Sequence, residues 1–327
     1  MSTPKYSVIV PLYNKERYIE RTLSSILAQR SDVSTPDYEL IVIDDGSTDS
    51  SLQVARTIIG DKRPWCRVVS QKNSGVAATR NNGVAMSTGE YICFLDSDDW
   101  WEPDFLAEMD RLIADFPEAG MYGTGFYLVK NGRRSVAPIG VDKDFERGYI
   151  NYCQTYAKTL CMPITSSSVT IRRECFVEAG QFNTKLTFGE DFDLWIRLAL
   201  AHPVALVNKP LSNYFQDQPV KGRATRRLHN PENHMLWNLE YLSDEEKRNG
   251  DLKLLLDKLR SSGLFFYYLS RQYHDATLPE LAKIDWTKLP HSSYKKYNSP
   301  IWRERLVFRL RRTGATIKKT LLSIVHS

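Results

Sequence analysis

The fold is decided by the stretch Gly89-Glu90-Tyr91-Ile92-Cys93-Phe94-Leu95-Asp96-Ser97-Asp98-Asp99. Its apolar middle, residues 91–95, has the composition of a buried parallel strand. Three carboxylates within four positions then repel one another unless a cation neutralises them. Oxygen-only ligands suit Mg2+ or Mn2+, with water and phosphate oxygens completing the coordination. On the motif alone, a solvated turn that caps a helix beginning near Pro103 is an equally open interpretation.

Strand and helix patterns alternate on both sides of this stretch. Short apolar runs rich in β-branched residues predict the strands, and the segments between the first four carry apolar residues at helical spacing. This alternation implies an α/β fold with a Rossmann-like, mostly parallel sheet and helices on both faces. A further helix is predicted at 191–201. The predicted strands are 7–12, 40–43, 68–69, 91–95, 121–129 and 169–172.

Polar clusters follow each of the first four predicted strands. Ligands of such sheets bind in the crevice beyond the carboxyl ends of the strands. Because all four clusters fall at those ends, we predict a binding site along that edge of the sheet. The clusters are Pro11-Leu12-Tyr13-Asn14, Asp44-Asp45-Gly46-Ser47, Gln71-Lys72-Asn73-Ser74-Gly75 and Asp96 to Asp99.

Bulk composition limits the class of protein. With 327 residues, 42% of them hydrophobic, the chain is long enough for one large core or two modest ones. Its five cysteines show no CxxC pair and no zinc-ligand spacing, which fits reduced thiols in a cytosolic protein. We expect no signal peptide and no membrane-spanning helix, since no apolar run approaches about 18 residues.

The positive charge is concentrated at one end of the chain. Residues 301–327 carry a net charge of +6, whereas the other 300 residues sum to −1. A nucleic-acid-binding face would need basic residues spread over the globular part. We therefore expect no nucleic-acid partner.

Together these motifs resemble the family-2 glycosyltransferases, whose fold is called GT-A. The resemblance runs from about residue 6 to about residue 215, in the family's order and spacing. It implies a metal-dependent inverting enzyme that moves a sugar from a nucleotide-sugar donor, UDP-linked, to a hydroxyl group. The matching segments are Val8 to Asn14, Ile43 to Asp49, Asn73 to Gly75, Arg80 to Gly83, Gly89 to Asp99 and Gly189 to Trp195.

The resemblance implies a set of donor-binding residues on the segments that follow the strands. Asp45 is expected to read the uracil or the ribose, and Arg80 to meet the base or a phosphate. For Arg80, an ordinary surface arginine on a helix is the alternative. The implied donor-binding residues are Pro11, Tyr13, Glu16, Asp45, Lys72, Arg80 and Asp96.

Metal and base are also implied by the resemblance. Asp98 is the expected ligand of Mn2+ or Mg2+, with Asp96 and His229 as further candidates, while Asp99 supports the site or caps the next helix. Asp191 is expected to take the proton of the acceptor hydroxyl. Its place at a helix start favours the ionised form. Glu190 is expected on the acceptor side; a pair of simple helix caps is the alternative.

Four segments follow from these assignments. Residues 1–218 form the GT-A domain, with a nucleotide-binding half to about residue 120 and an acceptor half at 121–218. Residues 219–230 form a flexible basic loop, predicted to close as a lid over the diphosphate. A helical C-terminal region covers 231–300 and a basic amphipathic tail 301–327. The predicted lid residues are Arg223, Arg226, Arg227 and His229.

The tail suggests a membrane-surface location. Its apolar residues fall on one helical face, which allows peripheral contact with an anionic membrane at the inner face of the cytoplasmic membrane. A helix that packs on the body is the alternative. Contact with the membrane would suit a glycan or lipid-linked acceptor in cell-surface polysaccharide synthesis. The apolar residues are Trp302, Leu306, Leu310, Ile317, Leu321 and Ile324.

Two other enzyme classes and one non-catalytic role share parts of this pattern. A glycosidase also uses paired carboxylates but needs no nucleotide-reading strand end. A nucleotidyltransferase carries a Gly-rich loop after the first strand, where this chain has Pro11-Leu12-Tyr13-Asn14. A non-catalytic scaffold that binds nucleotide sugar within a polysaccharide assembly complex stays open as the alternative function.

Overall fold

The computed structural model describes residues 4–29, 37–60, 63–217, 228–308 and 310. The chain divides into two compact units, Met1–Asn238 and Leu239–Ser327. Part of the expected lid, Arg223, Arg226 and Arg227, lies outside the described residues, as does most of the expected tail.

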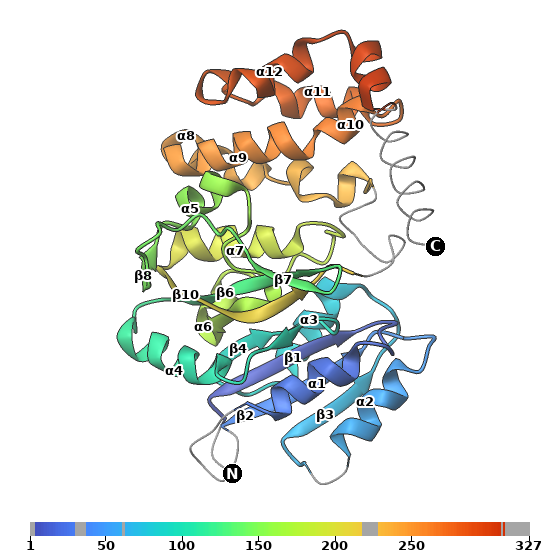
Figure 1. Ribbon diagram of the computed structural model, residues 1–327, viewed down its shortest axis with the longest axis vertical. Coiled ribbons are helices and arrows are strands. Elements are labelled where there is room, and N and C mark those ends of the chain that lie inside the picture. The colour runs from blue at the N-terminus through green and yellow to red at the C-terminus, as the bar shows by residue number, and fades with distance from the viewer. Residues whose placement is uncertain (1–3, 30–36, 61–62, 218–227, 309, 311–327) are drawn as a thin grey trace. The chain divides into compact units, whose positions relative to one another are not determined.

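A ten-stranded sheet forms the centre of the first unit (Figure 1). Its first four strands run parallel, as predicted, with Val8 level with Leu40 on one side and with Cys93 on the other. The order along the sheet is β3 (Cys66–Ser70), β2 (Tyr38–Asp44), β1 (Tyr6–Leu12), β4 (Tyr91–Phe94), β9 (Val169–Arg172), β6 (Met121–Lys130), β10 (Val204–Phe215) and β5 (Trp100–Trp101). β7 (Arg133–Val136) pairs with β6, and β8 (Arg147–Ile150) with β10.

β9 reverses the direction of the sheet. It pairs antiparallel with β4 on one side and with β6 on the other. Its first residues therefore lie beside the carboxyl end of β4, where Cys93 is level with Thr170. This brings the short helix Ser166–Ser168, which leads into β9, to the edge where the acidic turn begins.

Helices cover both faces of the sheet, as the alternating pattern predicted. α1 (Ile19–Leu27), α2 (Ser51–Ile59) and α4 (Phe105–Asp115) share a core with Val8 and Val10 of β1.

The other face holds α3 (Val76–Ala85), α6 (Arg173–Glu178) and α7 (Glu190–Ala201). A Cβ atom at Gly83 of α3 would lie 2.4 Å from Ile9 Cγ2, so the glycine lets this helix approach β1. Figure 1 shows the helices on the two sides of the sheet, with α5 (Tyr152–Thr159) near α7.

The first unit ends later than the sequence suggested. Two short 3-10 helices, Pro231–Asn233 and Met235–Trp237, belong to it rather than to the C-terminal region. The N–H of Met235 donates to Phe188 O at 3.1 Å. Because this bond ties the segment to the chain just before α7, the boundary falls at Asn238 and not at residue 230.

The second unit is helical, as predicted. Arg260 is 1% exposed and pairs with Glu246 at 2.5 Å and with Glu280 at 3.6 Å, so this helical core contains a network of buried charges. No helix in the described residues is long and apolar enough to cross a bilayer. The labelled α-helices are α8 (Ser243–Arg248), α9 (Gly250–Gly263), α10 (Phe265–Leu269), α11 (His274–Ala282) and α12 (His291–Asn298), and a further C-terminal helix covers residues 301–308.

Candidate active site

The loops after β1 and β2 are bonded to each other at the carboxyl edge of the sheet. Asn14 Oδ1 accepts the N–H of Thr48 at 2.8 Å. The Glu16 carboxylate accepts the N–H of Ser50, the residue before α2, at 3.0 Å. Glu16 therefore joins one wall of the predicted nucleotide pocket to the start of a helix.

Asp45 organises the loop between β3 and α3. Its Oδ1 accepts hydrogen bonds from Gln71 Nε2 and the N–H of Ser74, both at 2.8 Å, and its Oδ2 accepts the N–H of Gly75 at 2.9 Å. The side chain is buried. These bonds hold the start of α3 against the end of β2.

Other predicted donor-binding residues differ in how open they are. Pro11 is buried within β1, whereas Tyr13 is 46% exposed beyond the end of that strand. Lys72, in the loop shaped by Asp45, is also exposed. Tyr13 and Lys72 are therefore open to contact with a ligand at this edge.

Arg80 connects the two halves of the site. Its guanidinium donates to Asp96 Oδ1 at 2.7 Å and to Glu190 Oε1 at 2.9 Å, and it lies 5.2 Å from the centre of the Phe182 ring. The side chain is only 3% exposed, so the interpretation as a surface arginine is wrong. Burial alone would lower the pKa of Arg80, but the carboxylates of Asp96, Glu190 and Asp191 raise it, so the group stays charged.

Asp98 has a cationic partner from this chain. The Lys15 Nζ atom lies 2.8 Å from Asp98 Oδ2, and both side chains are mostly buried. Arg21 donates to the Asp98 carbonyl oxygen at 2.9 Å. Burial raises the pKa of Asp98, as does Asp96, while Lys15 lowers it; the net direction is upward. The lysine thus supplies part of the neutralisation that the sequence argument assigned to a metal.

Asp99 is an internal structural acceptor. Its Oδ2 accepts the hydroxyl of Ser167 at 2.6 Å, and its Oδ1 accepts the N–H of Phe215 at 2.8 Å. It therefore ties the acidic turn to the residues before β9 and to the end of β10. Burial, together with Asp98 and Asp96, raises its pKa well above the usual value. The expectation that Asp99 caps the next helix is wrong, because α4 begins at Phe105 with Asp104 as its N-cap.

The acidic turn still fits a hard divalent cation. The carboxylate oxygens of Asp96 and Asp98 are suitable donors, and the Asp96 side chain is 33% exposed. In the part of the chain that the structure describes, this turn does not gather three ligand atoms within 4.8 Å of one another. A cation here would therefore take most of its ligands from water and substrate phosphates, as Mg2+ usually does.

His229 packs against the segment that precedes α7, Thr187 and Phe188. It is buried, its Nδ1 atom is 3.2 Å from the Thr187 hydroxyl, and its ring centre is 4.8 Å from that of Phe188. These contacts place it beside the segment that leads to Glu190.

Asp191 is the second residue of α7. Its Oδ1 accepts the N–H of Phe192 at 2.8 Å, while the N-cap position is Gly189 with no side-chain cap. Burial and the neighbouring Glu190 raise the pKa of Asp191 to about 7, although Arg80 opposes them. Burial and charge repulsion thus outweigh the helix-dipole effect that favoured a fully ionised group. The Glu190 carboxylate pairs with Arg80.

Gly189 is required where it stands. Its φ of +81° is unfavourable for other residues, and a Cβ atom there would lie 2.4 Å from Met235. This glycine lets the chain turn into α7 directly under the 3-10 helices, and so it sets the position of Asp191.

Two residues that contact the acidic turn, Lys15 and Ser167, are not predicted from the sequence. Lys15 lies inside the Tyr13-Asn14-Lys15-Glu16 segment, but a lysine in a polar loop carries no signal of its own. Ser167 belongs to the run Thr165-Ser166-Ser167-Ser168, which offered four hydroxyl groups and no indication of their partner. Both make their contacts with the acidic turn across long sequence separations.

Comparison with known sequences and structures identifies relatives. Residues 7–175 match the family model described as "Glycosyl transferase family 2". "Glycosyltransferase GlyA" of Streptococcus pneumoniae serotype 4 is 35% identical over 112 residues, which are 34% of this chain and 15% of that protein. "Amylovoran biosynthesis glycosyltransferase AmsB" of Erwinia amylovora is 26% identical over 226 residues, 65% of this chain and 70% of that one.

This chain spans a third or less of the length of the first curated relatives that it matches. A solved structure, S. aureus TarS 1–349 in complex with UDP-GlcNAc, superposes with a TM-score of 0.71 at 19% identity. The superposition covers 95% of this chain and 92% of that one. At this identity the likeness shows the GT-A fold.

Proposed function

Because the chain belongs to glycosyl transferase family 2, we propose that it is an inverting enzyme that uses a UDP-linked sugar donor. The sugar passes to a hydroxyl of a glycan or lipid-linked acceptor in the synthesis of a cell-surface polysaccharide. The name of AmsB, which refers to amylovoran biosynthesis, and the TarS complex with UDP-GlcNAc support this assignment by similarity.

The ion pairs of Arg80 carry the proposal. The guanidinium binds Asp96, which follows the carboxyl end of β4 on the side proposed to bind the sugar donor. It also binds Glu190, the residue next to the proposed base Asp191. Donor-side and acceptor-side acids therefore belong to one site, as a direct transfer between two bound substrates requires.

The solvent-exposed residues in the nucleotide-binding half bind the sugar donor. Tyr13 offers a ring at the end of β1, and the exposed Lys72 offers a charge to a phosphate. Asp45 acts mainly by holding the loop from Gln71 to Gly75 in place. Arg80 is a positioning residue that sets the Asp96 carboxylate.

Asp191 is the proposed base. It accepts the proton of the acceptor hydroxyl as the oxygen attacks the anomeric carbon. A pKa of about 7 is close to the value that serves a general base best at neutral pH. Glu190, held by Arg80, faces the acceptor side.

Asp98, with Asp96, would hold Mn2+ or Mg2+. When bound, such a cation supplies positive charge that stabilises the departing diphosphate. Until then Lys15 neutralises the Asp98 carboxylate. We assign His229, which packs on Phe188, to supporting the wall before Asp191 and not to the cation.

The C-terminal helix supports a location at the cytoplasmic face of the membrane. Trp302 is 67% exposed, Leu306 49% and Leu310 62%, and the three lie at helical spacing on one side. The net charge of residues 301–327 complements an anionic lipid surface.

Turnover with a panel of nucleotide sugars tests the function. Full-length protein with Mn2+ should release UDP from one donor and transfer its sugar to an acceptor glycan. The Asp191→Asn variant should bind UDP as the wild type does in isothermal titration, yet transfer about 100- to 10,000-fold more slowly. Asp144→Asn, which changes an exposed acid, serves as the control. Tight UDP binding by the wild type without turnover of any donor would favour the scaffold alternative.

A further inference from the structure

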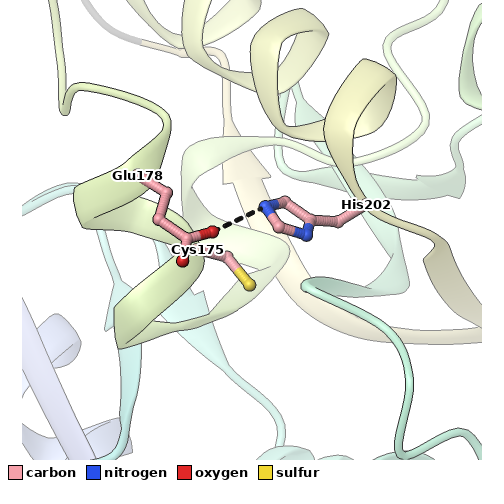
Figure 2. Close-up of side chains that lie close together, drawn as sticks. All are labelled: Cys175, Glu178 and His202. Carbon is pink, nitrogen blue, oxygen red and sulfur yellow. Dashed lines mark ion pairs between the residues drawn. The ribbon is translucent and has the colours of Figure 1, made fainter.

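Three side chains able to bind a metal ion converge between α6 and the C-terminal end of α7, outside the proposed active site. Cys175 and Glu178 lie one turn apart on α6, and His202 follows the end of α7. The Cys175 Sγ atom, a Glu178 carboxylate oxygen and a His202 ring nitrogen all lie within 4.8 Å of one another. Figure 2 shows the Glu178 oxygen facing the His202 ring, with Nε2 and Oε2 3.5 Å apart.

Backbone hydrogen bonds hold these segments together. The N–H of Arg172, just before α6, donates to Gly120 O at 3.0 Å, and the N–H of Gly120 donates to Pro203 O at 3.0 Å. The chain segments that carry Cys175 and His202 are thus bonded to the two sides of one glycine. These bonds fix the backbone segments that carry the thiol and the imidazole.

Gly120 also provides the space in which the side chains meet. A Cβ atom at this position would lie 2.7 Å from His202 Cβ and 3.0 Å from Cys175 Sγ. Any other residue would push the imidazole and the thiol apart. The close approach of the two is therefore a consequence of this particular glycine.

We propose that Cys175, Glu178 and His202 bind a zinc ion, with water in the fourth position. A sulfur, a nitrogen and an oxygen donor match the mixed ligand sets of zinc and do not suit Mg2+ or Mn2+. In a tetrahedral site, Zn–N and Zn–S bonds of about 2.0 and 2.3 Å place the ligand atoms roughly 3.3–3.6 Å apart. The separation of 3.5 Å between His202 and Glu178 already falls in that range.

The remaining adjustment is small. Cys175 is buried on α6, whereas the Glu178 side chain is 65% exposed, so a change of its rotamer is enough to close on an ion. The ion fastens α6 to the C-terminal end of α7, the helix whose first turn carries Glu190 and Asp191. The site thus stabilises the support of the active site without contacting its substrates.

Cobalt titration tests the proposal. Full-length protein, freed of metal with a chelator, is titrated with Co2+, and the near-ultraviolet charge-transfer band of a cobalt–thiolate bond is recorded. We expect one equivalent of Co2+ to produce the band and one equivalent of Zn2+ to abolish it. The Cys175→Ser variant should give no band. A wild type without the band, or a band that survives Cys175→Ser, overturns the proposal.

Two further variants test the site without replacing the buried Cys175, whose substitution could disturb folding. Glu178→Gln and His202→Gln, checked for folding by circular dichroism, should each weaken Co2+ binding at least about tenfold, the smallest loss produced even by outer partners of metal ligands. Cys66→Ser, which removes a partly buried thiol at the β3 edge, and Asp98→Asn should both retain the band. Affinity unchanged in both glutamine variants would contradict the site.

Discussion

Among single residues, the Asp98 carboxylate has two competing cationic partners, Lys15 and the proposed divalent cation. Lys15 holds it at 2.8 Å in the protein alone, and the proposed divalent cation needs the same oxygen atoms. The ammonium has to be displaced before the cation can bind. The released ammonium would then be available to pair with a phosphate of the proposed donor.

Lys15→Met should therefore raise the affinity of the nucleotide-free protein for Mn2+ by about tenfold, because a partly buried ion pair no longer opposes binding. Electron paramagnetic resonance of free Mn2+ measures this directly. Lys130→Met, at the exposed end of β6, removes the same charge and should change the affinity little. An unchanged or weaker affinity in Lys15→Met would show that the lysine does not compete for Asp98.

The raised pKa of Asp191 predicts how activity depends on pH. Below pH 7 the carboxyl group is mostly protonated and cannot accept a proton, so kcat/KM should fall as the pH drops through about 7. Glu190 is one cause of the raised pKa, so Glu190→Gln should move the midpoint to lower pH. A pH profile at fixed Mn2+ measures both. If the midpoint stays in place or rises in Glu190→Gln, the fall in kcat/KM at low pH belongs to the titration of another group.

At the scale of elements, the position of α3 depends on one small residue. This helix carries Arg80, whose two ion pairs require a close approach to β1 and β4. Gly83→Ala would place a methyl group 2.4 Å from Ile9 Cγ2. The helix must then move outward, and the ion pairs with Asp96 and Glu190 must lengthen.

We expect Gly83→Ala to lower the free energy of unfolding by about 1–3 kcal/mol, as overpacking of a core does, and to weaken UDP binding as well. Urea unfolding and isothermal titration measure the two effects. Gly250→Ala is the matched control, because nothing lies within 4 Å of its added Cβ and its position starts a helix. Equal stability of Gly83→Ala and the wild type would refute the packing argument.

For the molecule as a whole, the apolar face of the C-terminal helix is the proposed membrane contact. Trp302 and Leu306 face solvent in the structure, next to a strongly basic terminus. Apolar burial and charge attraction together suffice for reversible binding to anionic bilayers.

Replacing Trp302 and Leu306 by serine should therefore reduce sedimentation with phosphatidylglycerol vesicles at low salt severalfold. Transfer to a soluble acceptor should not change. Neutral phosphatidylcholine vesicles provide the lipid control, and Tyr241→Ser, which removes another exposed aromatic residue, provides the protein control. If the double variant binds anionic vesicles as the wild type does, the helix is not the membrane contact.

The first four strands, the helices between them and the edge at which they form a site could be predicted from the sequence, whereas β5, β7, β8 and β10 could not. Continuous apolar runs and period-3.6 patterns decide which residues can be buried, and parallel strands necessarily present their carboxyl ends together. Residues 91–99 were therefore enough to locate the acidic turn. Asp191 and Arg80 were found because they belong to recognisable motifs at fixed spacing.

Which charges meet depends on the packing of distant segments. Ion pairs form between groups that are near in space, and nothing in local pattern links Lys15 to Asp98 or Arg80 to Glu190. Burial, which raises the pKa of Asp191, is likewise a property of the packed chain. The spacing of the cysteines indicated no zinc site, yet Cys175 and His202 meet because Gly120 bonds the two segments together.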